Sequence, residues 1–231
     1  MDWQAWHEDY GDSNSALGQR LVLVQKQVRA ALERAEPGPV KVISVCAGQG
    51  HDLIGALADH PRRADVTARL VEIDAHNVLA ARRAAMAAGL DGVKVVAGDA
   101  SITDAYAGAV PADLVLLCGV FGNITAADIA NTVRHLPSLC ASAAAVIWTR
   151  HRHPPDLTPY IRETFAQGGF AELAFEDSPP FGVGVNRLAT LPQPFQGGIR
   201  LFEFVGYDLL RPDFHTSQGG RVQPNKDAHW R

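Results

Sequence analysis

The stretch from residue 40 to residue 52, VKVISVCAGQGHD, constrains the fold of this chain more than any other. It is typical of a buried strand (residues 40–45), a tight turn that carries Gly48 and Gly50, and the start of a helix. Glycine tolerates the dihedral angles of such a turn, and its missing side chain lets backbone amides approach a ligand. A second apolar run follows and ends in LVEID, whose last residue is Asp74. Strand, glycine turn, helix, strand and acid, in this order, indicate a site for a nucleoside-containing cofactor.

The periodicity of apolar residues predicts five strand–helix units and then an antiparallel edge. The expected parallel strands are residues 40–45, 68–73, 93–97, 113–118 and 143–148. The expected helices are residues 15–35, 52–60, 77–88, 125–136 and 157–167. Short antiparallel strands are expected at residues 171–176, 181–188 and 201–207. This order predicts an α/β fold with the ligand crevice at the carboxyl ends of the first and fourth strands.

Length and composition suit one α/β domain and restrict the partners. The 231 residues divide into an N-terminal lid or helical segment (1–38), a cofactor-binding domain (39–210) and a polar tail (211–231). The net charge of −4 gives no electrostatic reason to expect nucleic acid, and no apolar run approaches the roughly 20 residues that span a membrane. Three cysteines without a CxxC pair, and no basic and apolar leader, indicate a reducing cytoplasm. The sequence predicts no oligomeric state.

A nicotinamide cofactor is the first alternative to consider. Its G-x-G-x-x-G turn would match Gly48 and Gly50, but the third position is Leu53. A branched side chain there hinders the close helix–strand packing that the dinucleotide turn requires. The chain also lacks a Tyr-x-x-x-Lys pair. An NAD(P)-dependent oxidoreductase is therefore the weaker hypothesis.

Across about residues 40–190, the chain resembles the class I S-adenosylmethionine (SAM)-dependent methyltransferase family. Four motifs carry the resemblance, in the family's order and spacing: SVCAGQG (44–50), VEID (71–74), AGDA (97–100) and DLVLLCGV (113–120). The resemblance implies a Rossmann-like methyltransferase fold, with a mostly parallel seven-stranded sheet, an antiparallel edge and helices on both faces. It implies SAM as the cofactor and S-adenosylhomocysteine (SAH) as the product.

The resemblance also implies which residues bind the cofactor. The turn would face the methionine part and the ribose, an acid would accept from both ribose hydroxyls, a second acid would bind adenine, and the residues after the fourth strand would line the methionine side. In that order these residues are Cys46, Ala47, Gly48, Gln49 and Gly50; Asp74 and Ala75; Asp99 and Ala100; Cys118, Gly119 and Val120.

Several of these assignments have structural alternatives. Asp74 could instead cap the helix that follows, and Asp99 could be a turn residue. The family's acid two residues before the first glycine is replaced by Ser44, and Cys46 stands in place of that glycine. These two positions therefore depart from the family pattern that contacts the SAM ammonium. Asp52 could replace them, or it could only compensate charge at the start of its helix.

Methyl transfer is an in-line displacement, so the protein mainly binds, aligns and excludes water. The catalytic candidates are His151, which follows the fifth strand, and His7, in an aromatic segment that could close over the site. The substrate-binding candidates are Tyr10, Phe121, Asn123 and Arg150. A solvated basic loop around Arg150 and an aromatic anchor for the first helix are the structural alternatives.

No metal site is predicted, because the two histidines of His151-Arg152-His153 lack accompanying carboxylates. The Asn/Asp-Pro-Pro-Tyr/Phe motif, which the family uses to methylate base or amide nitrogens, is absent after the fourth strand. The sequence therefore predicts a SAM-dependent methyltransferase for a small-molecule acceptor, with oxygen as the first atom to test. A non-enzymatic SAM-binding or regulatory protein of the same fold is the remaining alternative.

Overall fold

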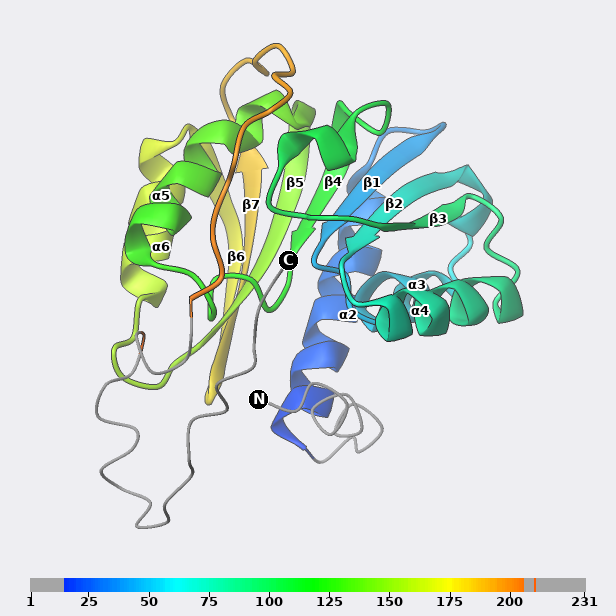
Figure 1. Cartoon of the computed structure of the whole chain (residues 1–231), viewed down its shortest axis with the longest axis horizontal. Helices are drawn as coiled ribbons and strands as arrows, with labels where there is room; N and C mark the ends of the chain where they lie inside the picture. The colour runs from blue at the N-terminus through cyan, green and yellow to red at the C-terminus, as the bar shows by residue number, and fades with distance from the viewer. Residues whose placement is uncertain (1–14, 206–209, 211–231) are drawn as a thin grey trace.

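The structure is a computed structural model that describes residues 15–205 and residue 210. Its centre is a seven-stranded sheet in the order β3-β2-β1-β4-β5-β7-β6 (Figure 1). The strands are β1 (Val40–Val45), β2 (Val66–Glu72), β3 (Val93–Ala97), β4 (Ala112–Leu117), β5 (Cys140–His151), β6 (Phe170–Ser178) and β7 (Phe181–Leu188). Strands β1 to β5 run parallel, whereas β7 is antiparallel to both β5 and β6. The predicted α/β class, with its antiparallel edge, is confirmed.

Helices cover both faces of this sheet. They are α2 (Ala16–Arg34), α3 (His51–Leu57), α4 (Ala75–Ala87), α5 (Ala126–His135) and α6 (Thr158–Gln167), with the short 3₁₀ helices η2 (Arg63–Asp65), η3 (Thr103–Tyr106) and η4 (Leu136–Ser138). Alternate residues of β4 supply the two cores, as expected for a strand buried on both sides. Leu114 and Leu116 pack with α2, α3 and α4, whereas Val115 and Leu117 pack with α5 and α6.

The order of the strands places a crevice where the sequence predicts it. Strand β1 lies between β2 and β4, so the chain leaves β1 toward one side of the sheet and leaves β4 toward the other. Such a reversal leaves an opening between the loops at the carboxyl ends of the two strands. The residues that follow Val45 and Leu117 therefore form the centre of the candidate site.

One predicted strand is absent from the described residues, and β5 extends furthest beyond its predicted bounds. Residues 201–205 form no strand; their backbone partners lie on a loop and a helix, because Leu201 donates to the Ser101 carbonyl (2.7 Å) and accepts from Thr132 Oγ1 (3.0 Å). We call residues 198–205 the strap. Strand β5 continues beyond the predicted residue 148 to His151, because β7 pairs with it as far as Phe181.

Candidate functional site

The turn after β1 has the backbone conformation that its glycines predict. Gly48 (φ 55°) and Gly50 (φ 77°) both lie in the left-handed region. A Cβ on Gly50 would come within 2.7 Å of Ile54 Cδ1. Both this clash and the positive φ exclude a side chain at this position. Cys46 also has a positive φ (52°), which is uncommon for a residue other than glycine. The turn therefore keeps its shape where the family has a glycine and this chain has a cysteine.

Glu72, at the end of β2, is the acid that holds this turn, and sequence reasoning missed it. Its Oε2 accepts from the Gly48 backbone amide (2.8 Å), and its Oε1 accepts from the amides of Ile73 (3.0 Å) and Asp74 (2.9 Å). The residue is 8% exposed. A buried carboxylate is stable with several such charge-assisted bonds. Glu72 thus provides a carboxylate beside the turn. Ser44, which stands in place of the family's acid, has no carboxylate to offer.

Asp74 is placed differently from the expectation for a ribose ligand. It is exposed, and its Oδ1 accepts from the Asn77 backbone amide (2.9 Å), which makes it the N-cap of α4. Ala75, also exposed, is the first residue of that helix. Gln49 Nε2 reaches the Asn77 side chain (3.3 Å) from the glycine turn. The structural alternative for Asp74, a helix cap, is therefore realised.

Asp99 lies in the loop after β3 and forms a small polar cluster with the strap. Its Oδ1 accepts from the Ser101 backbone amide (2.9 Å) and hydroxyl (2.6 Å), and its Oδ2 lies 3.6 Å from Arg200 Nη1. Ala100 is buried beside it, and its carbonyl accepts from the Tyr106 hydroxyl (2.7 Å). The Asp99 side chain remains 44% exposed, so a carboxylate oxygen is accessible at this strand end.

The loop after β4 is fixed by hydrogen bonds. Gly119 (φ 80°) donates its amide to Thr149 Oγ1 (2.9 Å), and its carbonyl accepts from Asn123 Nδ2 (2.7 Å). Val120 and Phe121, predicted to face cofactor and acceptor, are fully buried. The Phe121 ring packs in the aromatic core with the rings of Trp148 and Phe165, because an apolar ring is more stable there than at the wet crevice.

Arg150 and His151 extend β5 beyond the predicted strand end, so this part of the basic segment is not a solvated loop. Arg150 is 4% exposed and donates to the Phe121 carbonyl, which ties β5 to the loop after β4. The His151 ring lies against Gly122, where a Cβ would be 3.5 Å from its Cδ2, and its centroid is 5.9 Å from that of His153. His151 is half-buried at the carboxyl edge, where the sequence placed it.

Two thiols at the centre of the site are not activated. Burial raises the pKa of Cys46 well above its usual range, and the charges of Glu72 and Asp99 raise it further. Burial also raises the pKa of Cys118. A thiol with a raised pKa stays neutral at pH 7 and is a poor nucleophile. Both cysteines are therefore uncharged residues that pack against the two cores.

Asp52 and Arg20 both lie near the residues that follow β4. Asp52 is in the first turn of α3, and its Oδ1 is buried without a hydrogen-bond partner among the described residues. Arg20, on α2, is 4% exposed, and its Nη1 would lie 3.8 Å from a Cβ on Gly119. The sequence analysis included Asp52 but not Arg20, whose place on an amphipathic helix gave no signal that it is buried.

Some predictions lie outside this site. His7 and Tyr10 are outside the described residues. Within residues 15–205, no group of three His, Cys, Asp or Glu side chains is placed to hold a metal ion. None of the helices in the described ranges is long and apolar enough to cross a membrane.

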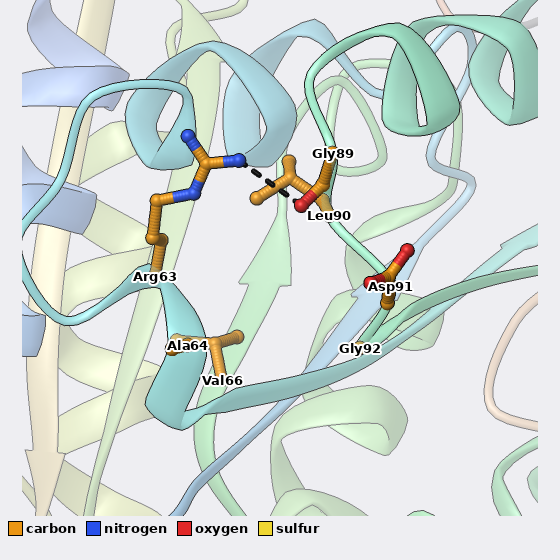
Figure 2. Close-up of a pocket in the computed structure, with 7 residues that line it drawn as sticks. All are labelled: Arg63, Ala64, Val66, Gly89, Leu90, Asp91 and Gly92. Carbon is orange, nitrogen blue, oxygen red and sulfur yellow. Dashed lines mark hydrogen bonds between the residues drawn. The ribbon is translucent and has the colours of Figure 1, made fainter.

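A pocket of about 220 Å³ lies at the opposite edge of the sheet, between the start of β2 and the residues that precede β3 (Figure 2). Figure 2 shows Arg63 reaching across it to the Gly89 carbonyl (3.0 Å). Arg63 also donates to the carbonyls of Ala58 and Ala88, at the ends of α3 and α4. Arg63 therefore caps the ends of two helices. The pocket lies apart from the crevice, which is at the carboxyl ends of the strands.

The same fold occurs in solved methyltransferase structures. An O-methyltransferase family protein from Burkholderia thailandensis superposes with a TM-score of 0.61 at 18% identity, over 75% of this chain and 56% of that chain. Magnesium protoporphyrin IX methyltransferase (ChlM) from Synechocystis PCC 6803, solved with bound SAM, superposes with a TM-score of 0.61 at 16% identity, over 81% of this chain and 91% of that chain. The chain thus spans a little over half of the Burkholderia structure and most of ChlM.

This chain has the Rossmann-like fold of SAM-dependent methyltransferases, as its four motifs predicted. No protein-family model and no curated protein matches it in sequence. The [4+2]-cyclase SpnF shares the fold as well, with a TM-score of 0.53 at 13% identity over 80% of this chain and 85% of that chain. Since one fold supports different reactions, the activity has to be argued from the site.

Proposed function

We propose that this chain is a SAM-dependent methyltransferase with a small-molecule acceptor. One observation carries the proposal: the glycine turn after β1, the carboxylate of Glu72 after β2 and the carboxylate of Asp99 after β3 occupy successive strand ends on one edge of the sheet. These are the places at which a nucleoside lying across the strand ends would meet backbone amides and two acids. The ChlM structure contains SAM in a protein of the same fold.

The residues present fit this cofactor. The turn from Cys46 to Gly50 carries two left-handed glycines that leave its backbone open to a ligand. A carboxylate offers two acceptor oxygens to a cis-diol, and we assign this contact to Glu72, which lies against the glycine turn, rather than to Asp74, whose Oδ1 caps α4. The accessible Asp99 carboxylate suits the adenine amino group. The buried Oδ1 of Asp52, which accepts no hydrogen bond from the described residues, suits the ammonium group.

SAM would supply an electrophilic methyl group. The protein then has to hold donor and acceptor in line, an alignment that contributes up to roughly 7–11 kcal/mol in well-oriented systems. The loop after β4 is held rigid by the Gly119 amide, which donates to Thr149 Oγ1, and by Arg150 and Asn123, which donate to the carbonyls of Phe121 and Gly119. His151, beside this loop, would accept a proton from an acceptor hydroxyl, because a neutral imidazole is a general base.

The acceptor is proposed to be a small molecule methylated at oxygen, and the protein to act in the cytoplasm. The absence of the base- and amide-methylating motif after β4 and the net charge of −4 support a small acceptor over nucleic acid. His151 supports oxygen, because a hydroxyl must lose a proton when it is methylated. His7 and Tyr10 remain candidates for the wall that closes over the acceptor.

Calorimetric titration of the full chain with SAH tests the cofactor. We expect saturable one-to-one binding in the micromolar range; no heat at protein concentrations of about 100 μM would refute the proposal. Transfer of a labelled methyl group from SAM to a fractionated metabolite extract then tests for turnover. Binding without transfer in any fraction would favour the non-enzymatic SAM-binding or regulatory alternative.

The oxidoreductase alternative loses support from the packing of α3. Leu53, at the position of the third glycine of a dinucleotide turn, is 1% exposed and packs in the core. The close approach of helix and strand that a glycine would allow is therefore blocked. A change in NADH or NADPH fluorescence on mixing with the protein would restore this alternative.

A further inference from the structure

The strap brings a charged side chain, that of Arg200, to the polar cluster at the end of β3. The Arg200 backbone pairs in antiparallel fashion with Ile102, and its carbonyl accepts from Asn131 Nδ2 of α5 (2.9 Å) (Figure 1). The next residue, Leu201, is fully buried. The backbone of Arg200 is therefore fixed beside the loop that carries Asp99, and its side chain starts from a defined position.

Three side chains of this cluster form a directed chain of hydrogen bonds. Arg200 Nη1 donates to Ser101 Oγ (2.9 Å), and Ser101 Oγ lies 2.6 Å from Asp99 Oδ1. A guanidinium group can only donate, so the hydroxyl accepts from Arg200 and directs its single proton to Asp99. Ser101 is 5% exposed, and its backbone amide also donates to Oδ1 (2.9 Å). One oxygen of the carboxylate is thereby fixed from within the protein.

The other oxygen of Asp99 stays available to a ligand. Among the described residues none donates a hydrogen bond to Oδ2, and Arg200 Nη1, at 3.6 Å, is too distant for one. Arg200 Nε lies 3.7 Å from Glu203 Oε1, also in the strap, and exposed ion pairs of this length add little stability. Burial and the charges of Glu72 and Asp99 raise the pKa of Cys46, so the Asp99 carboxylate lies toward the glycine turn.

We propose that Arg200 is a positioning residue that selects adenine as the base of the cofactor. Through Ser101 it fixes Oδ1 of Asp99 and leaves Oδ2 for the 6-amino group, a donor that guanine and hypoxanthine replace with an acceptor oxygen. The inference rests on the proposed function, which assigns adenine to Asp99, and adds to it the part played by the strap. Loss of the guanidinium would free the hydroxyl and the carboxylate to turn, so that the amino group would meet a less well-oriented acceptor.

Two ligands that differ in one group test this inference. SAH carries the 6-amino group, whereas its 6-deamino analogue has purine in place of adenine and offers no donor there. Their dissociation constants are measured by calorimetry for the full chain and for the variants Arg200→Met, Arg200→Lys and Ser101→Ala. Arg134→Met is the matched control, because Arg134 is an exposed arginine on α5, the helix that holds the strap.

We expect the wild type to bind SAH about tenfold or more tightly than the analogue, because the bond to a charged acceptor is lost with the donor. Arg200→Met and Ser101→Ala should each lower this ratio about threefold or more and leave the affinity for the analogue within about twofold. Arg200→Lys should retain most of the ratio, since an ammonium group also donates to the Ser101 hydroxyl. Arg134→Met should change neither constant.

The double variant tests whether the two residues act through the same carboxylate. Arg200→Met combined with Ser101→Ala should lower the ratio no further than Ser101→Ala alone, because the two changes break one chain of hydrogen bonds. A further loss that equals the product of the single effects would overturn the inference.

An unchanged ratio in Arg200→Met would overturn the inference as well. So would an equal loss of affinity for both ligands, which would show that Arg200 only supports the strap. Equal binding of both ligands by the wild type would mean that Asp99 does not contact the amino group, and would leave the proposed function standing. Failure of the proposed function is distinct, because the wild type would then bind neither ligand.

Discussion

At the scale of single residues, two neighbouring acids are candidates for the proposed ribose contact, and the structure gives them different hydrogen-bond partners. The motif VEID offers Glu72 and Asp74, and the sequence alone favours Asp74 as the ribose ligand. The structure ends β2 at Glu72 and starts α4 at Ala75, so Asp74 falls at the N-cap position. Its carboxylate serves a backbone amide of the helix, which leaves Glu72 as the acid beside the glycine turn.

Substitution of each acid separates these roles. We expect Glu72→Gln to weaken SAH binding at least tenfold, because the amide nitrogen repeats neither the charge nor the second acceptor. We expect Asp74→Ala to leave SAH binding within about twofold and to lower the free energy of unfolding by about 1 kcal/mol through loss of the cap. Calorimetry and urea unfolding measure the two effects. A larger loss of affinity in Asp74→Ala than in Glu72→Gln would restore Asp74 as the ribose ligand.

The proposed proton acceptor makes a different prediction at this scale. His151→Asn should lower kcat about 100-fold for an acceptor identified in the extract screen and leave SAH affinity unchanged, because the ring is not assigned to the cofactor. The acidic limb of the rate profile should disappear as well, because only a neutral imidazole can accept the proton. His153→Asn is the control. The His153 ring lies beside that of His151, but His153 comes after the end of β5. An unchanged rate profile in His151→Asn would remove this histidine from the mechanism.

At the scale of elements, local sequence signals predicted most of the fold. The bounds of β1, β3 and β7 match the predictions, and Ser15 and Thr125, the first residues of two predicted helices, are the N-caps of α2 and α5. The period of apolar residues and the capping side chains are local properties, so a single sequence reveals them.

The elements that the sequence did not predict depend on distant partners. The strap is apolar enough to suggest a strand, but its hydrogen bonds go to residues about 70 and 100 positions away. Arg20 and Arg150 are buried only because other elements pack over them. Candidate site residues were therefore predicted where a motif fixes them, as in the glycine turn, and missed where tertiary packing decides, as for Glu72 and Arg20.

Arg62 holds the end of α2 and the link to β1, so we expect its replacement to lower stability. Its Nη1 donates to the carbonyls of Leu32 and Ala35 (both 2.7 Å), and its Nη2 donates to those of Glu36 (2.8 Å) and Gly38 (2.9 Å). These carbonyls form the end of α2 and the link to β1. Arg62→Met should lower the free energy of unfolding by about 2–3 kcal/mol, because several charge-assisted bonds to an otherwise uncapped helix end are lost together.

Urea unfolding measures this loss. The variant and the wild type should show the same dependence of the unfolding free energy on urea concentration. Arg83→Met is a matched control, because Arg83 is an exposed arginine on α4. The control should stay within about 0.5 kcal/mol of wild type, as most exposed substitutions do. An Arg62 variant as stable as the control would mean that solvent satisfies these carbonyls as well as the guanidinium does.

At the scale of the whole molecule, the two cores bury groups that ionise only at alkaline pH. Burial raises the pKa of the Cys140 thiol to about 12 and that of the Tyr106 hydroxyl well above its usual range. Burial likewise raises the pKa of Cys46 and Cys118. In the unfolded chain, thiols lose their protons near pH 8.5 and tyrosine near pH 10. The folded protein therefore holds more protons than the unfolded chain above pH 8.5.

Because the folded state binds the extra protons, its stability must fall as pH rises through this range. The stabilisation is fully present below pH 8.5, and each raised thiol then removes up to about 1.4 kcal/mol per pH unit until its folded pKa is reached. Urea unfolding between pH 7.5 and pH 10.5 should show this steep decline. Cys140→Ala should be less stable at pH 7.5, since a buried side chain is truncated, yet its decline should be shallower by up to about 1.4 kcal/mol per unit. Parallel curves for wild type and Cys140→Ala would show that this thiol already ionises within the fold, and that the core around β5 admits water.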